Sequence, residues 1–196
     1  MPRKKIVDDN KILKKILEVI KKVGATEFSL EDLRETTGLS PATLLQRFGS
    51  KKNIVYKAIE LANYDLKTNF NKKILTNKSF IQEIIHIYLE LSASFSHPND
   101  VAGGLDILKI DINDKKLNAL TRNYFSIRRK KIESLLILAK QKNELPPHIK
   151  VIDITWNLES LWQGSIVLWA LTGNGSLSKW LSQRFESFFE AISGSS

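Results

Sequence analysis

The sequence contains no cysteine, and it contains no long apolar run. Without thiols there can be no disulfide framework, thiolate zinc site, iron–sulfur cluster or cysteine nucleophile. The longest apolar run is Ile166–Leu171, far short of the roughly 20 residues that cross a bilayer. No apolar stretch of signal-peptide length follows the basic N-terminus. We therefore expect a cytoplasmic protein that has no membrane partner.

Proline is also scarce, with five in 196 residues. No stretch alternates apolar and polar residues long enough to predict a strand. Apolar spacings of three and four dominate, which predicts an all-α fold of about nine helices. We expect these helices over residues 9–23, 30–37, 41–48, from 51 onward, 79–95, 101–109, 114–142, 150–171 and 178–192.

Acidic residues are outnumbered by basic ones, and the net charge is +9. Residues 1–60 carry 13 basic and 8 acidic groups, a net charge of +5, and residues 114–147 carry 9 and 3, a net charge of +6. An excess of positive charge favours anionic partners such as nucleic acid, but it says nothing about the fold. The two basic segments each need their own explanation.

No catalytic constellation is visible. The three histidines, His86, His97 and His148, are scattered along the chain. His86 and Glu90 lie one helical turn apart and could share a metal ion, but no third ligand accompanies them. Phosphate-binding loops, nucleophile elbows and dinucleotide fingerprints are absent from the sequence. We expect no enzymatic activity, no cofactor and no metal.

Residues 29–48 carry the pattern of a helix-turn-helix. Ser29 is suited to begin one helix as its N-cap, and Gly38 is suited to end it in a left-handed conformation. Leu39 can fill the gap between the two helices. Ser40 and Pro41 then begin the next helix as an N-cap followed by proline at the first position. The alternative is an ordinary corner between two helices of a helical domain.

The second helix of this motif would place Leu44 and Phe48 inward. Small residues near its start permit close approach to base edges in the major groove. Gln46 can hydrogen-bond a base edge, and Arg47 can bind phosphate or guanine. Lys51 would meet phosphate at the start of the following helix. The candidate DNA-binding residues are Ser29, Ser40, Pro41, Ala42, Thr43, Leu45, Gln46, Arg47 and Lys51.

Residues 10–60 resemble the TetR family of transcriptional regulators. The resemblance rests on Gly24, on Ser29, and on the runs Thr37-Gly38-Leu39-Ser40, Thr43-Leu44-Leu45-Gln46-Arg47-Phe48 and Ser50-Lys51. It implies a homodimer that binds a palindromic double-stranded DNA operator and releases it when a small-molecule effector fills the C-terminal domain. Two positions differ from the family pattern: Leu45 replaces the usual tyrosine, and Glu31 is acidic.

The resemblance implies two domains. Residues 1–50 would form the helix-turn-helix DNA-binding domain, and residues 51–196 a helical ligand-binding and dimerisation domain, with the helix after Ser50 connecting them. The basic arm Pro2-Arg3-Lys4-Lys5 either enters the minor groove beside the motif or is a solvated terminus. A helical adaptor that binds protein without DNA specificity is the alternative function.

The last two helices are apolar on more than one side, which favours a second packing surface. In TetR-like proteins these helices pair with those of the partner in a four-helix dimer interface, and the alternative is burial within the monomer. Gly164 and Ser165 could allow a close helix crossing. The candidate interface residues are Leu161, Gly164, Ser165, Leu168, Trp180, Phe185 and Phe188.

A ligand pocket would lie among the helices of the C-terminal domain. Its candidate lining residues are Tyr88, Phe95, Leu105, Phe125, Arg128, Trp156 and Trp162. Plain core packing is the alternative for the aromatic residues, because aromatic residues at helical spacing usually just pack.

The second basic segment includes Arg128-Arg129-Lys130-Lys131. Measured from Leu120, Arg128 and Lys131 fall on the apolar side of their helix, whereas Arg129 and Lys130 point away. A cation on an inner face must extend to solvent, pair with an acid or meet an anionic ligand. The acids considered as internal partners are Asp106, Asp111 and Glu159.

Overall fold

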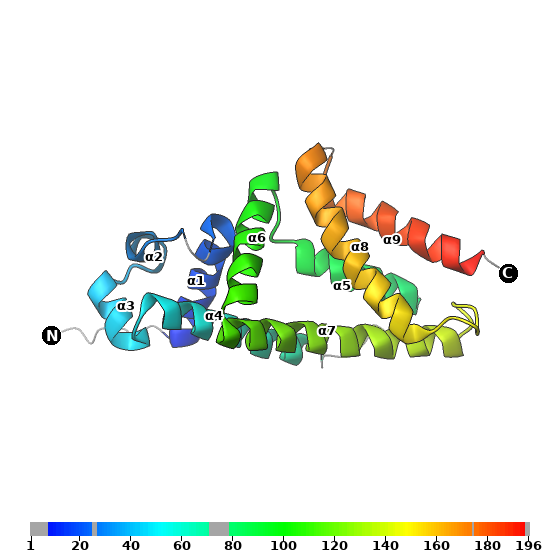
Figure 1. Cartoon of the computed structure of the whole chain (residues 1–196), viewed down its shortest axis with the longest axis horizontal. Coiled ribbons are helices and arrows are strands. Elements are labelled where there is room, and N and C mark those ends of the chain that lie inside the picture. Colours follow the sequence, from blue (N-terminus) through cyan, green and yellow to red (C-terminus); the bar gives the residue numbers. More distant parts are fainter. Residues whose placement is uncertain (1–7, 25–26, 71–78, 174, 195–196) are drawn as a thin grey trace. The chain divides into compact units, whose positions relative to one another are not determined.

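The computed structural model describes residues 8–24, 27–70, 79–173 and 175–194, with the backbone alone described for residues 69, 70, 103 and 106–111. The described residues form nine α-helices and no strand (Figure 1), which confirms the all-α prediction. The helices are α1 (Asp9–Val23), α2 (Leu30–Thr37), α3 (Pro41–Phe48), α4 (Lys51–Phe70), α5 (Phe80–Ser92), α6 (Pro98–Asn113), α7 (Lys115–Gln141), α8 (Val151–Thr172) and α9 (Leu177–Ser193). None of them, as far as they are described, is long and apolar enough to cross a membrane.

The chain packs into two compact units. Unit 1 comprises Met1–Asn69 and Ala102–Phe125, and unit 2 comprises Phe70–Val101 and Ser126–Ser196. Both units take residues from α6 and α7. This division follows packing, and the division into a DNA-binding and a ligand-binding domain stays a prediction.

Unit 1 is built around the apolar stripe of α1. Five residues of this helix, spaced by three and four, are buried, as expected for an amphipathic helix. Residues of α2, α3, α4 and the start of α7 pack against them, so that the four N-terminal helices share one core. Its most deeply buried members are Ile12, Ile16, Ile20, Phe28, Leu33, Leu44, Ile54 and Ala58.

Unit 2 has its own core, formed by α5, α7, α8 and α9. Tyr88, Leu135, Leu158 and Phe185 are fully buried in it. The rings of Tyr88 and Phe185 are stacked with their centroids 4.8 Å apart. The prediction that Phe185 faces a second chain is therefore wrong, because its ring is needed to fill the core of its own unit.

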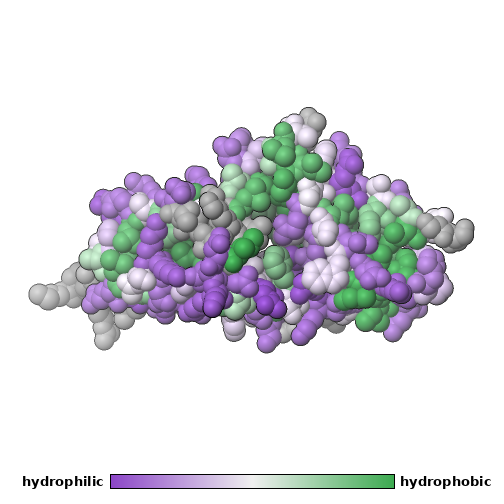
Figure 2. Space-filling view, in the orientation of Figure 1, coloured by the Kyte–Doolittle hydropathy of each residue, from purple (hydrophilic) through white to green (hydrophobic). Residues whose placement is uncertain are grey.

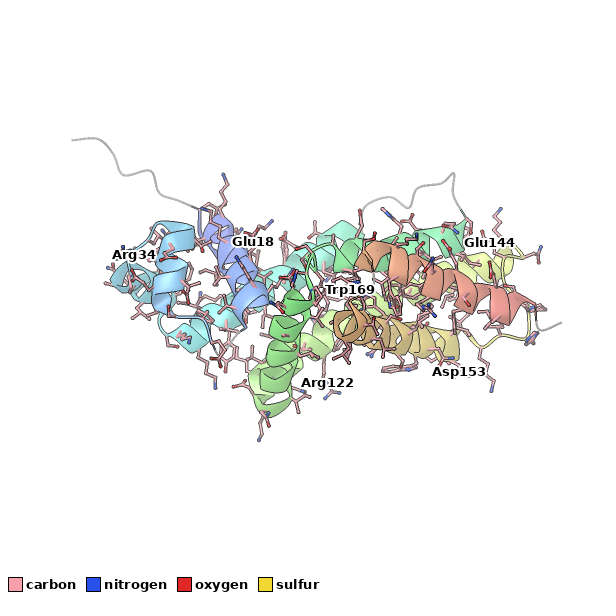
Figure 3. All side chains as sticks on the ribbon, turned by 90° about the horizontal axis from the view of Figure 1, so that it is seen from above. Glu18, Arg34, Arg122, Glu144, Asp153 and Trp169 are labelled. Carbon is pink, nitrogen blue, oxygen red and sulfur yellow. The ribbon has the colours of Figure 1, made fainter. Side chains whose placement is uncertain are left out.

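Glu144 caps the N-terminus of α5 from the segment between α7 and α8 (Figure 3). Its carboxylate accepts hydrogen bonds from the Ser79 hydroxyl at 2.6 Å and from the backbone N–H groups of Phe80 and Ile81 at 3.1 Å. The first N–H groups of a helix have no partner within the helix, and the helix dipole favours an anion there. Glu144 thus fixes the position of α5 within unit 2.

The ends of α5 and α6 differ from the sequence prediction. We expected helices over 79–95 and 101–109, whereas α5 ends at Ser92 and α6 runs from Pro98 to Asn113. Before α6, the Asp100 carboxylate accepts the backbone N–H groups of Ser96 and His97 at 2.8 Å. This cap, followed by proline at the first position, begins the helix three residues earlier than the apolar pattern indicated.

Replacing Gly38 tests the backbone requirement at the end of α2. Gly38 has φ +75°, and a Cβ at this position would have no atom within 4 Å. Gly38→Ala should therefore destabilise the protein by about 1–2 kcal/mol through backbone strain and not through a clash. Urea unfolding measures the loss. Gly38→Asn is the matched control and should lose less free energy of unfolding, because asparagine tolerates the left-handed conformation. Equal losses for the two variants would contradict the explanation.

Candidate DNA-recognition surface

Local hydrogen bonds determine the turn between α2 and α3. Gly38 adopts the left-handed conformation, and its N–H donates to the carbonyl of Arg34 at 2.8 Å. The Leu39 N–H donates to the Thr37 hydroxyl at 3.2 Å. Ser40 then begins α3 by accepting the N–H of Thr43 at 3.2 Å. The two helices and the turn between them form the helix-turn-helix that the sequence indicates.

Packing decides which side of α3 faces outward. Leu44 is fully buried and Phe48 nearly so. Ala42, Leu45 and Gln46 are exposed, and their spacing of three and four places them on the opposite face of the helix. The outward face thus carries one methyl group, one leucine that is 37% exposed, and one amide. It is small and uncharged, which suits close approach to base edges.

The hydroxyl residues predicted to contact DNA lie at the helix N-termini. Ser29 forms a capping box with Asp32, whose carboxylate accepts the Ser29 N–H at 2.6 Å. This contact lowers the pKa of Asp32. The Ser40 and Thr43 hydroxyl oxygens lie 2.9 Å apart and share a hydrogen bond. Pro41, between them in sequence, is half-buried.

The two predicted phosphate-binding cations already contact other residues. The Arg47 guanidinium lies 2.5 Å from the Asp9 carboxylate at the start of α1. The Lys51 ammonium lies 4.4 Å from the centre of the Phe28 ring, within the range of a cation–π interaction. Asp9 and Phe28 were not among the predicted site residues, because a contact between distant parts of the chain leaves no spacing pattern in the sequence.

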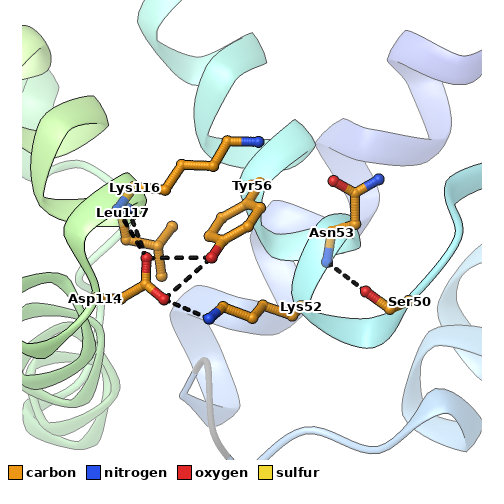
Figure 4. A network of polar contacts seen from close by, with 7 residues as sticks. All are labelled: Ser50, Lys52, Asn53, Tyr56, Asp114, Lys116 and Leu117. Carbon is orange, nitrogen blue, oxygen red and sulfur yellow. Dashed lines mark hydrogen bonds and ion pairs between the residues drawn. The ribbon is translucent and has the colours of Figure 1, made fainter.

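A polar network joins α4 to the start of α7 within unit 1 (Figure 4). Lys52 lies 2.6 Å from the Asp114 carboxylate, and the Tyr56 hydroxyl donates to its two oxygens at 3.0 and 3.1 Å. The same carboxylate accepts the N–H groups of Lys116 and Leu117 at 3.0 Å. The hydrogen bond from Lys52, followed by that from Leu117, lowers the pKa of Asp114 far below its ordinary value. Sequence patterns did not indicate this network.

A second polar network is buried in unit 2. Arg128 is fully buried and pairs with Glu159 through its Nε at 2.8 Å and through its Nη2. The Tyr88 hydroxyl donates to Glu159 at 3.2 Å, and burial raises the pKa of this hydroxyl far above its ordinary value. The guanidinium carbon lies 4.4 Å from the Trp162 ring centre. Arg128 therefore has the internal acidic partner that was one of the three expectations.

Three of the seven predicted pocket residues come together in this network: Tyr88, Arg128 and Trp162. None of the other four is described in contact with Arg128 or Glu159, although Phe95 packs against the apolar core that contains Tyr88 and Trp162. Trp156 is 51% exposed, with the guanidinium of Arg129 4.2 Å from its ring centre. Leu105 is 45% exposed and belongs to unit 1. The remaining members of the set are half-buried: Phe95 in unit 2 and Phe125 in unit 1.

Several other residues singled out in the sequence have side chains that are not described or that are only partly buried. The side chains of Asp106 and Asp111, considered as partners of Arg128, lie outside the described residues, as does the basic arm at residues 2–5. Lys131 is half-buried. No group of three or more His, Cys, Asp or Glu residues that could hold a metal ion occurs in the part of the chain that is described.

The predicted interface residues of α8 and α9 are unequally exposed. Leu168 is 55% exposed, and Gly164 is exposed as well. Ser165 is buried, and its carbonyl accepts the Trp180 indole N–H at 3.0 Å. Hydrophobic residues gather over the C-terminal end of α8 (Figure 2), where Leu171 is 78% exposed. Leu161, Trp180 and Phe188 are half-buried.

The arrangement of these helices, and not the sequence, is what matches known proteins. No family model and no curated protein matches the sequence. Among solved structures, a TetR transcriptional regulator from Legionella pneumophila superposes with a TM-score of 0.72 at 14% identity, covering 96% of this chain and 100% of the other. The chain has the fold of the TetR-family regulators.

Two further structures with this TetR-like fold were determined with a bound molecule. One is described as a transcriptional regulator from Saccharomonospora viridis, in complex with choline; the TM-score is 0.73 at 19% identity, over 92% of this chain and 94% of that one. The other is FadR from Bacillus subtilis in complex with stearoyl-CoA, with a TM-score of 0.65 at 13% identity, over 94% and 97%. The likeness extends over both units of the chain.

The Asp114 network should make stability depend on pH. Because folding lowers the pKa of Asp114, its contribution is fully present above the ordinary aspartate pKa of about 4 and is lost as the pH falls below it. Asp114→Asn should therefore be less stable than the wild type at neutral pH, and the difference should shrink towards about pH 3. Urea unfolding across this range measures it.

The matched control for this prediction is Glu35→Gln, which removes an exposed carboxylate from α2 of the same unit. Its stability should follow that of the wild type across the pH range. A difference between Asp114→Asn and the wild type that does not change with pH would contradict the assignment.

Proposed function

We propose that the protein is a sequence-specific DNA-binding transcriptional regulator, a homodimeric repressor of the TetR type that a small-molecule ligand releases from a palindromic operator. The observation that carries the proposal is the exposed, small and uncharged face of α3, bordered by Arg47 and Lys51. In this proposal residues 1–50 form the DNA-binding domain. Residues 51–196 form the ligand-binding and dimerisation domain.

On DNA, α3 would lie in the major groove. Gln46 would hydrogen-bond a base edge, and Leu45 would contact a thymine methyl group in place of the phosphate contact that a tyrosine makes. Pro41 and Ala42 would allow the helix to come close to the bases. The phosphate backbone would be contacted by Ser29, Ser40, Thr43, Arg47 and Lys51.

Dimerisation is supported by the exposed apolar residues of α8. Leu168 and Leu171 are more than half exposed, and each buried leucine contributes roughly 1.5–3 kcal/mol when it leaves water. A second copy of the same face would cover them symmetrically. The two DNA-binding domains, called heads from here on, would then match half-sites about one helical turn apart.

Ligand response is supported by the two structures with the same fold that contain choline and stearoyl-CoA. In this chain the ligand would bind in unit 2, beside Tyr88, Arg128 and Trp162. Binding would favour a conformation in which the separation of the heads no longer matches the operator. Arg128 would then either hold its internal pair with Glu159 or bind an anionic group of the ligand.

A helical adaptor that binds only protein is the second candidate. It would use the same exposed apolar residues of α8 but would show no salt-dependent affinity for DNA. The two functions therefore differ in one measurement, the affinity for duplex DNA at several salt concentrations.

The wild-type protein should bind a palindromic duplex, selected from random sequences, with an affinity that falls steeply with salt. Gln46→Ala should lose about 1–3 kcal/mol of discrimination at the base it contacts. Lys51→Ala should weaken binding to all sequences alike and reduce the salt slope by about 1 per head. Fluorescence anisotropy with selected and mixed-sequence duplexes measures both effects.

Lys57→Ala is the matched control, because Lys57 is an exposed lysine further along the same helix as Lys51. It should bind the selected duplex much as the wild type does. If the wild type selects no sequence and shows only weak binding to any duplex, the regulator hypothesis fails and the adaptor is favoured.

Leu168→Glu and Leu171→Glu should convert the dimer into a monomer. Both side chains are exposed in the single chain, so a charge there leaves the core of unit 2 intact but would be buried in the dimer. Sedimentation velocity measures the mass, and circular dichroism checks that the helices remain. Ile112→Glu, at a residue that is 66% exposed on α6, is the control and should stay dimeric. A wild-type monomer would rule out the interface.

A further inference from the structure

The contact between Arg47 and Asp9 joins two helices at the edge of the proposed DNA-binding surface. Arg47 lies in the last turn of α3, and Asp9 is the first residue of α1. Their side chains are 26% and 55% exposed, respectively, and their charged atoms are 2.5 Å apart. The pair is therefore reachable from solvent, and a phosphate group could compete with the carboxylate for the guanidinium.

The Asp9 carboxylate is also stabilised by its position in α1. Asp9 lies in the first turn of α1, where the helix dipole favours a negative charge. The preceding residue, Asp8, is the N-cap and accepts the N–H of Asn10 at 3.1 Å. Helix α1 thus begins with two carboxylates that are stabilised by the helix itself, and one of them contacts Arg47.

Lys51 lies on the same surface, with its ammonium 4.4 Å from the centre of the Phe28 ring, and its charge also lowers the pKa of Asp32. Asp9 supplies a full negative charge to Arg47 at a much shorter distance, 2.5 Å. A phosphate approaching Arg47 must displace this carboxylate and also approaches a like charge, which is unfavourable.

We propose that Asp9 is a positioning residue that competes with DNA phosphate for Arg47, so that DNA binding exchanges one ion pair for another. This inference rests on the proposed function, because it requires Arg47 to meet the DNA backbone. Its consequence is weaker binding to all sequences alike, since phosphate contacts carry no sequence information. Recognition of the operator then depends more heavily on the uncharged residues Ala42, Leu45 and Gln46.

The test is a double-mutant cycle on the full chain with the variants Asp9→Asn, Arg47→Gln and the combination of both. The probes are a mixed-sequence duplex of about 30 base pairs, long enough for two half-sites, and a duplex selected from random sequences. The Asp9→Asn variant should bind both duplexes about three- to fivefold more tightly for each head. This factor corresponds to the free energy that an exposed ion pair contributes. A merely structural residue would not strengthen binding when it is replaced.

Asp8→Asn is the matched control. It removes the same charge one residue away and retains the cap, because asparagine is as good an N-cap as aspartate. Its effect on binding should be smaller than that of Asp9→Asn. In the Arg47→Gln background, Asp9→Asn should have no larger effect than Asp8→Asn has, because the cation for which Asp9 competes is gone. Thermal unfolding checks that all variants are folded.

The outcomes separate this inference from the proposed function. If the wild type binds duplexes with a steep salt dependence but Asp9→Asn has the same effect as Asp8→Asn, or tightens binding more than Asp8→Asn does even without Arg47, the proposed exchange is overturned and the regulator function stands. Weaker binding by Asp9→Asn also overturns it, because Asp9 would then assist Arg47. If the wild type shows no salt-dependent binding to either duplex, both proposals fall together.

Discussion

The burial of Leu44 and Phe48 is the constraint on which the rest of the proposed DNA-binding surface depends. These two side chains hold α3 against the core of unit 1. They thereby determine that Ala42, Leu45 and Gln46 face outward. A rotation of the helix by one residue, about 100°, would turn the Phe48 ring away from the core. The apolar core of the unit therefore controls the chemistry that α3 presents.

Unit 2 contains a different kind of contact within its apolar core, the buried pair of Arg128 and Glu159. Transferring two charges from water to a protein interior is costly, and their attraction offsets the cost only when the geometry of the pair is good. Here Tyr88 donates to the same carboxylate, and the Trp162 ring lies against the guanidinium. Loss of either charged partner would leave the other buried without compensation. The pair directly joins α7 to α8 within unit 2.

Much of the fold was predictable because helix ends are largely local. Ser29, Gly38 and Ser40 mark the ends of α2 and α3 through hydrogen bonds that span four residues or fewer, and the apolar spacing of α1 gave its bounds correctly. The ends of α5 and α6 were less predictable. There the Asp100 cap and the remote Glu144 carboxylate determine the local geometry, and neither follows from apolar periodicity.

The proposed DNA-binding surface was likewise predictable only in part. The residue pattern around Gly38 was enough to predict the motif and the outward face of α3, because both follow from helical geometry and local capping. Only the tertiary structure placed Asp9 beside Arg47, Phe28 beneath Lys51, and Asp114 beside Tyr56. It also moved Phe185 from a predicted interface into the core and Trp156 from a predicted pocket to the surface. The physical reason is that periodicity reveals which side of a helix is apolar, whereas the partner that covers each residue depends on contacts between segments far apart in the chain.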